Sequence, residues 1–147
     1  MKTIKYVLKM NGNTATPISP NTTVHDALKR MVEQGESVLP VLENGKFVGV
    51  ISEVDSERNI FLVGDNHRDN FVKDVMDRTP VYTSPDRKIE ECMEVMTAQK
   101  IQSIPVLSGD KYLGMVSIGD LARIIISDQK EIIHKLEEYI LENTFIT

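Results

Sequence analysis

The sequence predicts a mixed α/β (α+β) fold, built from two pseudosymmetric βαββα repeats that pack through their sheets. Residues 19–58 align with residues 84–123 over forty positions without a gap, and twelve of these positions are identical. Both copies show helical apolar spacing followed by two strand-like runs around a turn. Only two copies are present, whereas an open solenoid needs about three or more. We therefore expect a tandem duplication packed about a pseudo-twofold axis.

Each repeat is expected to begin with a short strand and a helix. The strand-like pieces lie around residues 14–18 and 80–83, and both run into Ser-Pro. Thr23 and Asp26 resemble a capping box at the start of the first helix. Apolar residues then recur at helical spacing. In the two copies these are Val24, Ala27, Leu28 and Met31, and Ile89, Cys92, Met93 and Met96.

A β-hairpin follows in each repeat. The predicted strands are 38–42 and 46–51 in the first copy and 103–107 and 111–116 in the second. Asn44-Gly45 is the strongest short hairpin signal, and Gly109-Asp110 takes the same place in the second copy. Proline cannot donate a hydrogen bond within a central ladder. We therefore expect Pro40 and Pro105 to begin or flank a strand.

A second helix follows Ser52 and Ser117. The first is expected to end near Gly64, with a polar linker at 65–70. The second continues to about Glu142 as an amphipathic helix. Its apolar residues are Leu121, Ile125, Ile132, Leu136 and Ile140. This extension has no counterpart in the first copy, so we expect it to cover another surface, such as a partner subunit. The predicted division is 1–66 for repeat one and 67–147 for repeat two, together one compact module.

Composition excludes several classes of function. There are 17 Lys and Arg against 22 Asp and Glu, a net charge of −5, without a dense basic cluster. Nucleic acid and anionic membranes are therefore not expected partners. The single cysteine, Cys92, excludes an internal disulfide, and the sequence shows neither a signal-peptide pattern nor an apolar run near 18 residues. These features predict a cytoplasmic protein. The three histidines lie far apart, so no metal site is predicted.

A polar motif, Ser-x-x-Asp-x-x-Arg, is repeated where each hairpin runs into its second helix. It comprises Ser52, Asp55 and Arg58 in the first copy, and Ser117, Asp120 and Arg123 in the second. The free N–H groups of a helix start can hold a phosphate, and a serine hydroxyl adds a donor. The aspartate can accept hydrogen bonds from a ribose diol, and the arginine can supply positive charge. The same Ser and Asp spacing is also that of a capping box, and both interpretations remain open.

These residues resemble a known family. The chain contains a duplicated Pro-(Asp/Asn)-x-x-(hydrophobic) helix start and one Ile-Pro-Val-Leu strand. Together with Val-Lys-Asp-Val-Met76 and Gly-Met-Val-Ser-Ile-Gly-Asp120, they are similar to the motifs of cystathionine-β-synthase (CBS) domains. In particular they resemble stand-alone proteins made of one tandem CBS pair. The resemblance covers the chain from about Ile4 to Tyr139.

The resemblance implies a non-catalytic regulatory module that binds an adenosine-containing ligand in clefts between the sheets. Its ligands would be AMP, ADP, ATP, NAD(H) or S-adenosylmethionine, with an AMP-like ligand expected first and no cofactor required. The module would be a homodimer that adjusts an unknown partner protein. One cleft would contain Thr79, Val81, Ser103, Ile104, Pro105, Ser117 and Asp120, with Arg123 beside it. Its twin would contain Thr14, Thr16, Val38, Leu39, Pro40, Ser52 and Asp55, with Arg58 beside it.

Two departures from similar proteins bear on the ligand. Where they often have Ser-Glu-Arg-Asp and Arg-His-Leu-Pro, this chain has Ser-Glu-Val54-Asp and Gln102-Ser103-Ile-Pro. Fewer cations favour a nucleoside or a monophosphate over a polyphosphate. The Ser117 cleft is expected to bind first, because Ile118-Gly119 crowds a ligand less than Glu53-Val54.

Two other functions remain open. One is a structural or interaction dimer whose clefts are empty. The other is an enzyme acting on a nucleotide, which is disfavoured because the sequence shows no activated nucleophile, metal cluster or oriented base.

Overall fold

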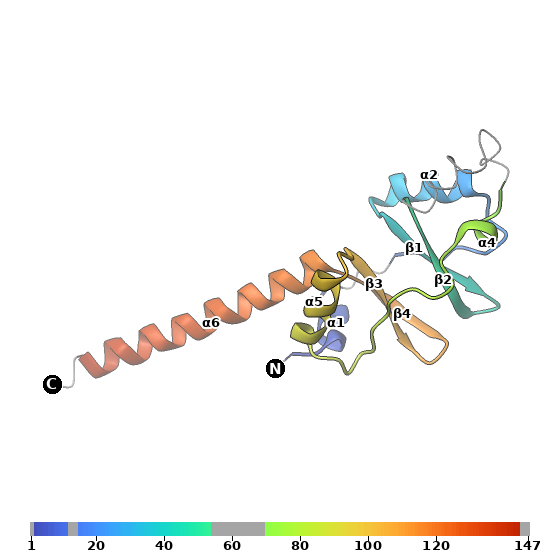
Figure 1. The fold of residues 1–147 in the computed structure, drawn as a ribbon. Helices are drawn as coiled ribbons and strands as arrows, with labels where there is room; N and C mark the ends of the chain where they lie inside the picture. Colours follow the sequence, from blue (N-terminus) through green and yellow to red (C-terminus); the bar gives the residue numbers. More distant parts are fainter. Residues whose placement is uncertain (1, 12–14, 54–69, 145–147) are drawn as a thin grey trace.

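The computed structural model describes residues 2–11, 15–53 and 70–144. Two small α/β units lie next to each other, and one long helix extends away from them (Figure 1). The elements are α1 (Ile4–Asn11), α2 (Val24–Gln34), β1 (Val38–Glu43), β2 (Lys46–Ser52), α4 (Val72–Val75), α5 (Ile89–Ala98), β3 (Ser103–Ser108), β4 (Lys111–Ser117) and α6 (Ile118–Thr144). Within these residues, none of the helices is long and apolar enough to span a membrane.

The two hairpins have the same register, which confirms the mixed α/β fold of two repeats. Strand β1 pairs antiparallel with β2, and β3 with β4. Val38 lies opposite Ser52 in the first sheet, and Ser103 lies opposite Ser117 in the second. Both ladders shift register at the equivalent step, directly after Val41 in β1 and Val106 in β3. The sheets approach each other through β2 and β4.

The first strand expected in each repeat is reduced to a single parallel bridge. Ile18 bridges to Val41, and Thr83 bridges to Val106. Pro40 and Pro105 lie inside β1 and β3, so the expectation that they begin or flank a strand was wrong. The carbonyl of Pro40 accepts from the N–H of Ile18 at 3.0 Å. Since the N and O of one strand residue point to the same side, the missing N–H of Pro40 faces this lone bridge, and the ladder with β2 loses nothing.

The helices that precede the two repeats are exchanged between their cores. Ile4 and Val7 of α1 are buried among α5, β3 and β4, in the core of repeat two. Val72 of α4 and the following Met76 are buried among α2, β1 and β2, in the core of repeat one. The sequence division at 66/67 therefore separates each core from one of its own packing segments.

Local signals explain the helix boundaries. The N–H of Asp26 donates to Thr23 Oγ1 at 3.2 Å, as predicted for the cap of α2. This helix ends at Gly35, whose φ of 66° lies in the left-handed region. Helix α6 continues to Thr144, which confirms the predicted extension. The expected helix end at Gly64 lies outside the described residues, as does most of the 65–70 linker.

Cys92 is buried in α5, as its apolar helix position predicted. Burial raises the pKa of its thiol. The thiolate is therefore disfavoured, and Cys92 acts as a small packing residue.

Tyr112 joins the two repeats, and removing its hydroxyl is expected to lower stability. Its O–H donates to the carbonyl of Ala15 at 3.0 Å, and its ring stacks with Phe47 at 6.3 Å between centroids. Burial raises the pKa of Tyr112, so the hydroxyl stays protonated as a donor. We expect Tyr112→Phe to lose about 1 kcal/mol of unfolding free energy in a urea titration. Tyr82→Phe, on a ring that is 63% exposed, is the control. Equal losses in the two variants would contradict this role.

Candidate functional site

Ser117 and Asp120 form a reciprocal capping box at the start of α6. The Ser117 N–H donates to Asp120 Oδ2 at 3.3 Å, and the Asp120 N–H donates to Ser117 Oγ at 3.1 Å. Asp120 Oδ1 also forms an ion pair with the Arg123 guanidinium. The capping interpretation is thus realised in the structure. It leaves room for a ligand role, because the Asp120 side chain remains 22% exposed.

These two residues face a cavity of about 320 Å³ between the repeats. Repeat two contributes Ser103, Met115, Ser117 and Asp120, and repeat one contributes Ala15, Gly35, Glu36 and Ser37. The cavity is lined by three serine hydroxyls and two carboxylates, so it is rich in groups that bind hydroxyls. Such a lining suits a polyol such as a ribose.

Glu36 makes this cavity acidic. Burial raises the pKa of its carboxyl, and the charge of Asp120 raises it further. Both residues line the cavity, so their two negative charges lie close enough to repel each other. A ligand with several negative charges is therefore opposed here, whereas a neutral diol can donate to both carboxylates.

The structure brings together Ser103, Ser117 and Asp120, but it places Thr79 and Val81 elsewhere. Thr79 lines a separate cavity of about 460 Å³. Val81 packs against the core of repeat two. Shortly before Thr79, Asp77 forms an isolated antiparallel bridge with Val50 of β2, in which each backbone N–H donates to the other residue's carbonyl, at 2.8 and 3.0 Å. This bridge draws the chain before repeat two onto the sheet of repeat one.

Three other predicted residues of the same cleft lie beside the cavity rather than in its lining. Ile104 and Pro105 are buried within β3. The side chain of Arg123 is 71% exposed next to Asp120. The guanidinium of Arg123 is therefore accessible from solvent, while the two β3 residues belong to the strand that carries Ser103.

Sequence reasoning missed the four cavity residues of repeat one. Ala15 lies between Thr14 and Thr16, which were both assigned to the twin cleft. Ala15 lies at this cavity because its carbonyl accepts a hydrogen bond from the hydroxyl of Tyr112, 97 positions away. A contact over that distance leaves no local signal. Glu36 and Ser37 follow the Gly35 cap of α2, and this cap could have marked a loop near the site.

Comparison with known proteins decides the family. A family model described as "CBS domain" matches residues 14–55 and 72–127. The chain belongs to the CBS-domain family. Both matched stretches contain one hairpin, so this is a CBS pair and the predicted resemblance is confirmed.

Three of the proteins similar to this CBS pair match most of its length. The mitochondrial CBS domain-containing protein CBSX3 of Arabidopsis thaliana is 31% identical over 94% of this chain and 71% of its own length. A CBS-domain protein of Burkholderia ambifaria MC40-6 has a solved structure with a TM-score of 0.77 and 33% identity, over 87% of this chain and 96% of that one. The structure of CBSX2 in complex with AMP has a TM-score of 0.73 and 22% identity, over 88% and 99%. The last likeness is one of fold.

The second cleft of the CBS pair is only partly described. Leu39 and Pro40 are buried within β1, Val38 and Ser52 are half-buried, and Thr16 is exposed. Thr14, Asp55 and Arg58 lie outside the described residues. The geometry of this twin cleft therefore stays a prediction.

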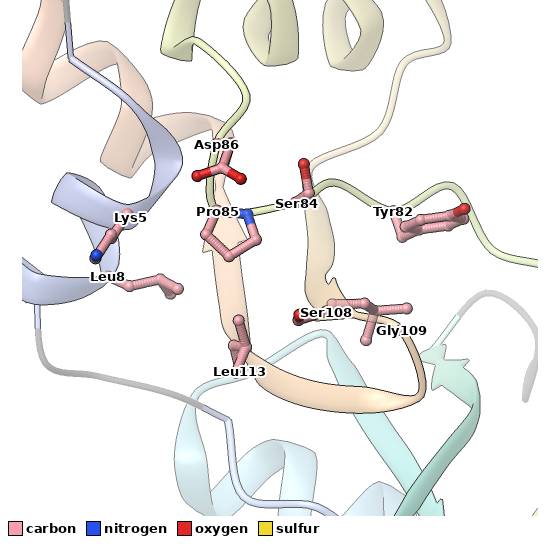
Figure 2. A pocket seen from close by; sticks show the side chains of 10 residues that line it. Lys5, Leu8, Tyr82, Ser84, Pro85, Asp86, Ser108, Gly109 and Leu113 are labelled. Carbon is pink, nitrogen blue, oxygen red and sulfur yellow. The ribbon is translucent and has the colours of Figure 1, made fainter.

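A larger cavity, of about 580 Å³, lies away from the Ser-x-x-Asp motif. Its side chains come from α1, from the segment 82–86 and from the β3–β4 hairpin (Figure 2). Among its described lining residues the charged ones are Lys5 and Asp86, and leucine and proline side chains make up much of its wall. We place the candidate site in the smaller cavity because its polar groups converge there. Among the described residues, no cluster of three or more His, Cys, Asp or Glu could hold a metal ion.

The raised pKa of Glu36 predicts a pH-dependent stability. The folded chain holds this proton more tightly than the unfolded chain, so the unfolding free energy falls as pH rises from the ordinary glutamate pKa through the raised value. Glu36→Gln should therefore be more stable than the parent protein at neutral pH, and this gain should vanish below about pH 4. Thermal unfolding across pH measures it. The control is Glu33→Gln, an exposed position on α2. The same profile in both variants would refute the burial of Glu36.

Proposed function

We propose that this CBS pair is a non-catalytic sensor that binds an adenosine-containing ligand, AMP or a similar one, in the cavity between its repeats. The observation that carries the proposal is the Asp120 carboxylate, which faces this cavity beside Ser117 while it caps α6. The AMP complex of CBSX2, a protein of the same fold, supports the ligand class.

The residues present favour a specific arrangement of the ligand. The two hydroxyls of a ribose would donate to Asp120, and the serine hydroxyls of the cavity would complete the polar contacts. Arg123 would meet a single phosphate at the cavity mouth. Because Glu36 adds negative charge, we expect adenosine and AMP to bind more tightly than ATP.

Binding between the repeats also suggests how a signal would leave the site. Repeat one supplies Glu36 and Ser37, and repeat two supplies Ser103, Ser117 and Asp120. A ligand that contacts both repeats favours the relative orientation in which both sets of contacts form. Helix α6 begins at this cavity, so a shift of its first turn would move its far end. An unknown regulated partner would respond to that movement.

A thermal-shift panel tests the proposal against the interaction dimer with empty clefts. The ligands are adenosine, AMP, ADP, ATP, NAD, NADH and S-adenosylmethionine. A ligand at one hundred times its dissociation constant stabilises the folded state by about 2.7 kcal/mol. We expect AMP to raise the melting temperature. If none of these compounds does so, the empty-cleft alternative is supported. Turnover of a bound nucleotide by the purified protein would instead support the enzyme alternative.

Assembly as a homodimer belongs to the same proposal. The outer part of α6 projects beyond the two repeats (Figure 1). Large apolar side chains are exposed along it. The expected compartment is the cytoplasm, although the similar Arabidopsis protein is named as mitochondrial. Sedimentation gives the mass, and a fluorescent fusion shows the compartment.

A further inference from the structure

The outer part of α6 has an apolar face that is open to solvent. Its first turns are held by the core of repeat two, where Leu121 is fully buried. Beyond them the helix leaves the body of the molecule (Figure 1). The large apolar side chains that are at least half exposed on this helix are Ile126, Ile132, Ile133, Leu136, Tyr139, Ile140 and Leu141.

These side chains follow a seven-residue repeat. Ile125, Ile132 and Tyr139 are spaced by seven, and so are Ile126, Ile133 and Ile140. Gln129 and Leu136 fall between them at the three- and four-residue steps of a heptad. A helix with such a seam packs along a second helix rather than against a flat sheet.

We infer that two copies of this chain pair through α6 in antiparallel orientation, with the crossing point near Ile133. This inference rests on the homodimer proposed above and adds its geometry. The exposed apolar stretch runs from Ile126 to Leu141, so its midpoint lies beside Ile133. About that midpoint Ile133 meets its own copy, and Ile126 meets Ile140 of the second copy.

The charges along α6 favour the antiparallel orientation. Residues 136–144 contain three glutamates and no basic residue, whereas residues 123–135 contain three basic and two acidic residues. A parallel pair would set the three glutamates of one copy against those of the other. In an antiparallel pair they face the more basic section, and Lys130 lies near Glu137 of the second copy on both sides of the crossing point.

A concave surface beside the first half of α6 could accommodate a second helix. A hollow of about 430 Å³ lies between α6, α5 and the N-terminal segment, with Ile125 and Ile132 in its lining. Lys2 borders it and forms an ion pair with Asp128. In an antiparallel dimer, the C-terminal part of the second copy's α6, around Tyr139, would pack into this concave surface. A parallel partner would set groove against groove.

Single-cysteine crosslinking tests the orientation. The variants are Ile126→Cys, Ile133→Cys and Ile140→Cys, each in the full chain under mild oxidation. The parent protein is the control, because its own Cys92 is buried. We expect Ile133→Cys to crosslink to itself, and the mixture of Ile126→Cys with Ile140→Cys to form a mixed dimer. Ile140→Cys alone should stay uncrosslinked, since an antiparallel pair holds its two copies about 20 Å apart along the axis.

The outcomes separate the orientation from the assembly and from the ligand. A monomeric mass of the parent protein at micromolar concentration would refute the homodimer. A dimeric mass with self-crosslinking of Ile140→Cys, or with no crosslink at Ile133→Cys, would refute the antiparallel pair alone. Circular dichroism of each variant confirms that it is folded. The ligand panel does not depend on any of these results.

A charge exchange gives a second readout. Lys130→Glu and Glu137→Lys should each weaken the dimer several-fold, and the double variant should return toward the parent affinity. Rescue is expected only where residue 130 faces residue 137 of the other copy. If the double variant is as weak as the single ones, the proposed register is wrong.

Discussion

Asp120→Asn is expected to weaken the binding of AMP ten- to hundredfold, or about 1.5–3 kcal/mol, while the apo protein stays nearly as stable. The asparagine oxygen can still accept from the Ser117 N–H, so the cap of α6 is largely kept. The ion pair with Arg123 is lost, but the Arg123 side chain is mostly exposed, so this loss is small. The ribose diol, in contrast, loses a charged acceptor inside the cavity. Calorimetric titration of both proteins measures the difference.

Asp26→Asn is the matched control for this experiment. Asp26 occupies the same third helical position behind a capping side chain, that of Thr23, but it is exposed on α2 and away from the cavity. If Asp120 only caps its helix, the two variants should each lose at most about 1 kcal/mol of stability and bind AMP like the parent protein. Unchanged affinity in Asp120→Asn would exclude the ribose role.

Gly49→Ala is expected to remove about 3 kcal/mol of unfolding free energy, because the added methyl group would overlap the backbone of the neighbouring segment. A Cβ at Gly49 would lie 2.4 Å from the carbonyl oxygen of Asp77. This carbonyl cannot simply rotate away, since it accepts from the Val50 N–H at 3.0 Å. The substitution therefore has to displace the segment that crosses from repeat two onto β2. Urea unfolding followed by circular dichroism gives the value.

Gly119→Ala is the control, because it makes the same chemical change on a helix. A Cβ there has its nearest contacts at 3.7 and 3.8 Å, with Arg123 and Ser117. Alanine is favoured over glycine inside a helix by roughly 0.5–1 kcal/mol, so this variant should be as stable as the parent protein or more so. If Gly49→Ala unfolds with the same free energy as the parent protein, the segment around Asp77 can move away from the new methyl group without loss of stability.

The features that the sequence predicted well are those with local signals. Asn44-Gly45 marked its hairpin, Thr23 marked the start of α2, and the 65-residue offset carried each assignment to the second copy. Ser117 and Asp120 were found in the same way, because two residues three positions apart lie on one turn of a helix whatever surrounds it. The family itself was also predicted from these residues and is confirmed.

What the sequence did not predict depends on contacts between the repeats. Thr79 was assigned to the Ser117 cleft from the family resemblance, but the chain before it pairs with β2 through Asp77 and Val50, and Thr79 lines a different cavity. Glu36 was not recognised, because its closeness to Asp120 arises only when the two repeats are packed. The position of Pro40 was predicted wrongly, because a proline fits inside β1 only where its missing N–H points away from the paired strand β2. Which way that N–H points depends on how the strands pair, and the local sequence does not show it.

The exchange of α1 and α4 between the two cores indicates how the fold could have arisen from a single repeat, and how the chain could be divided. Helix α1 completes the core of repeat two, and α4 completes the core of repeat one. Two separate copies of a single repeat would complete each other in the same manner, each lending its leading helix to its neighbour. The architecture is thus that of a segment-swapped dimer whose two members share one polypeptide. If the chain were cut at 66/67, each half would lack one helix of its hydrophobic core. The two halves, expressed together as separate chains, should therefore associate and form the complete fold.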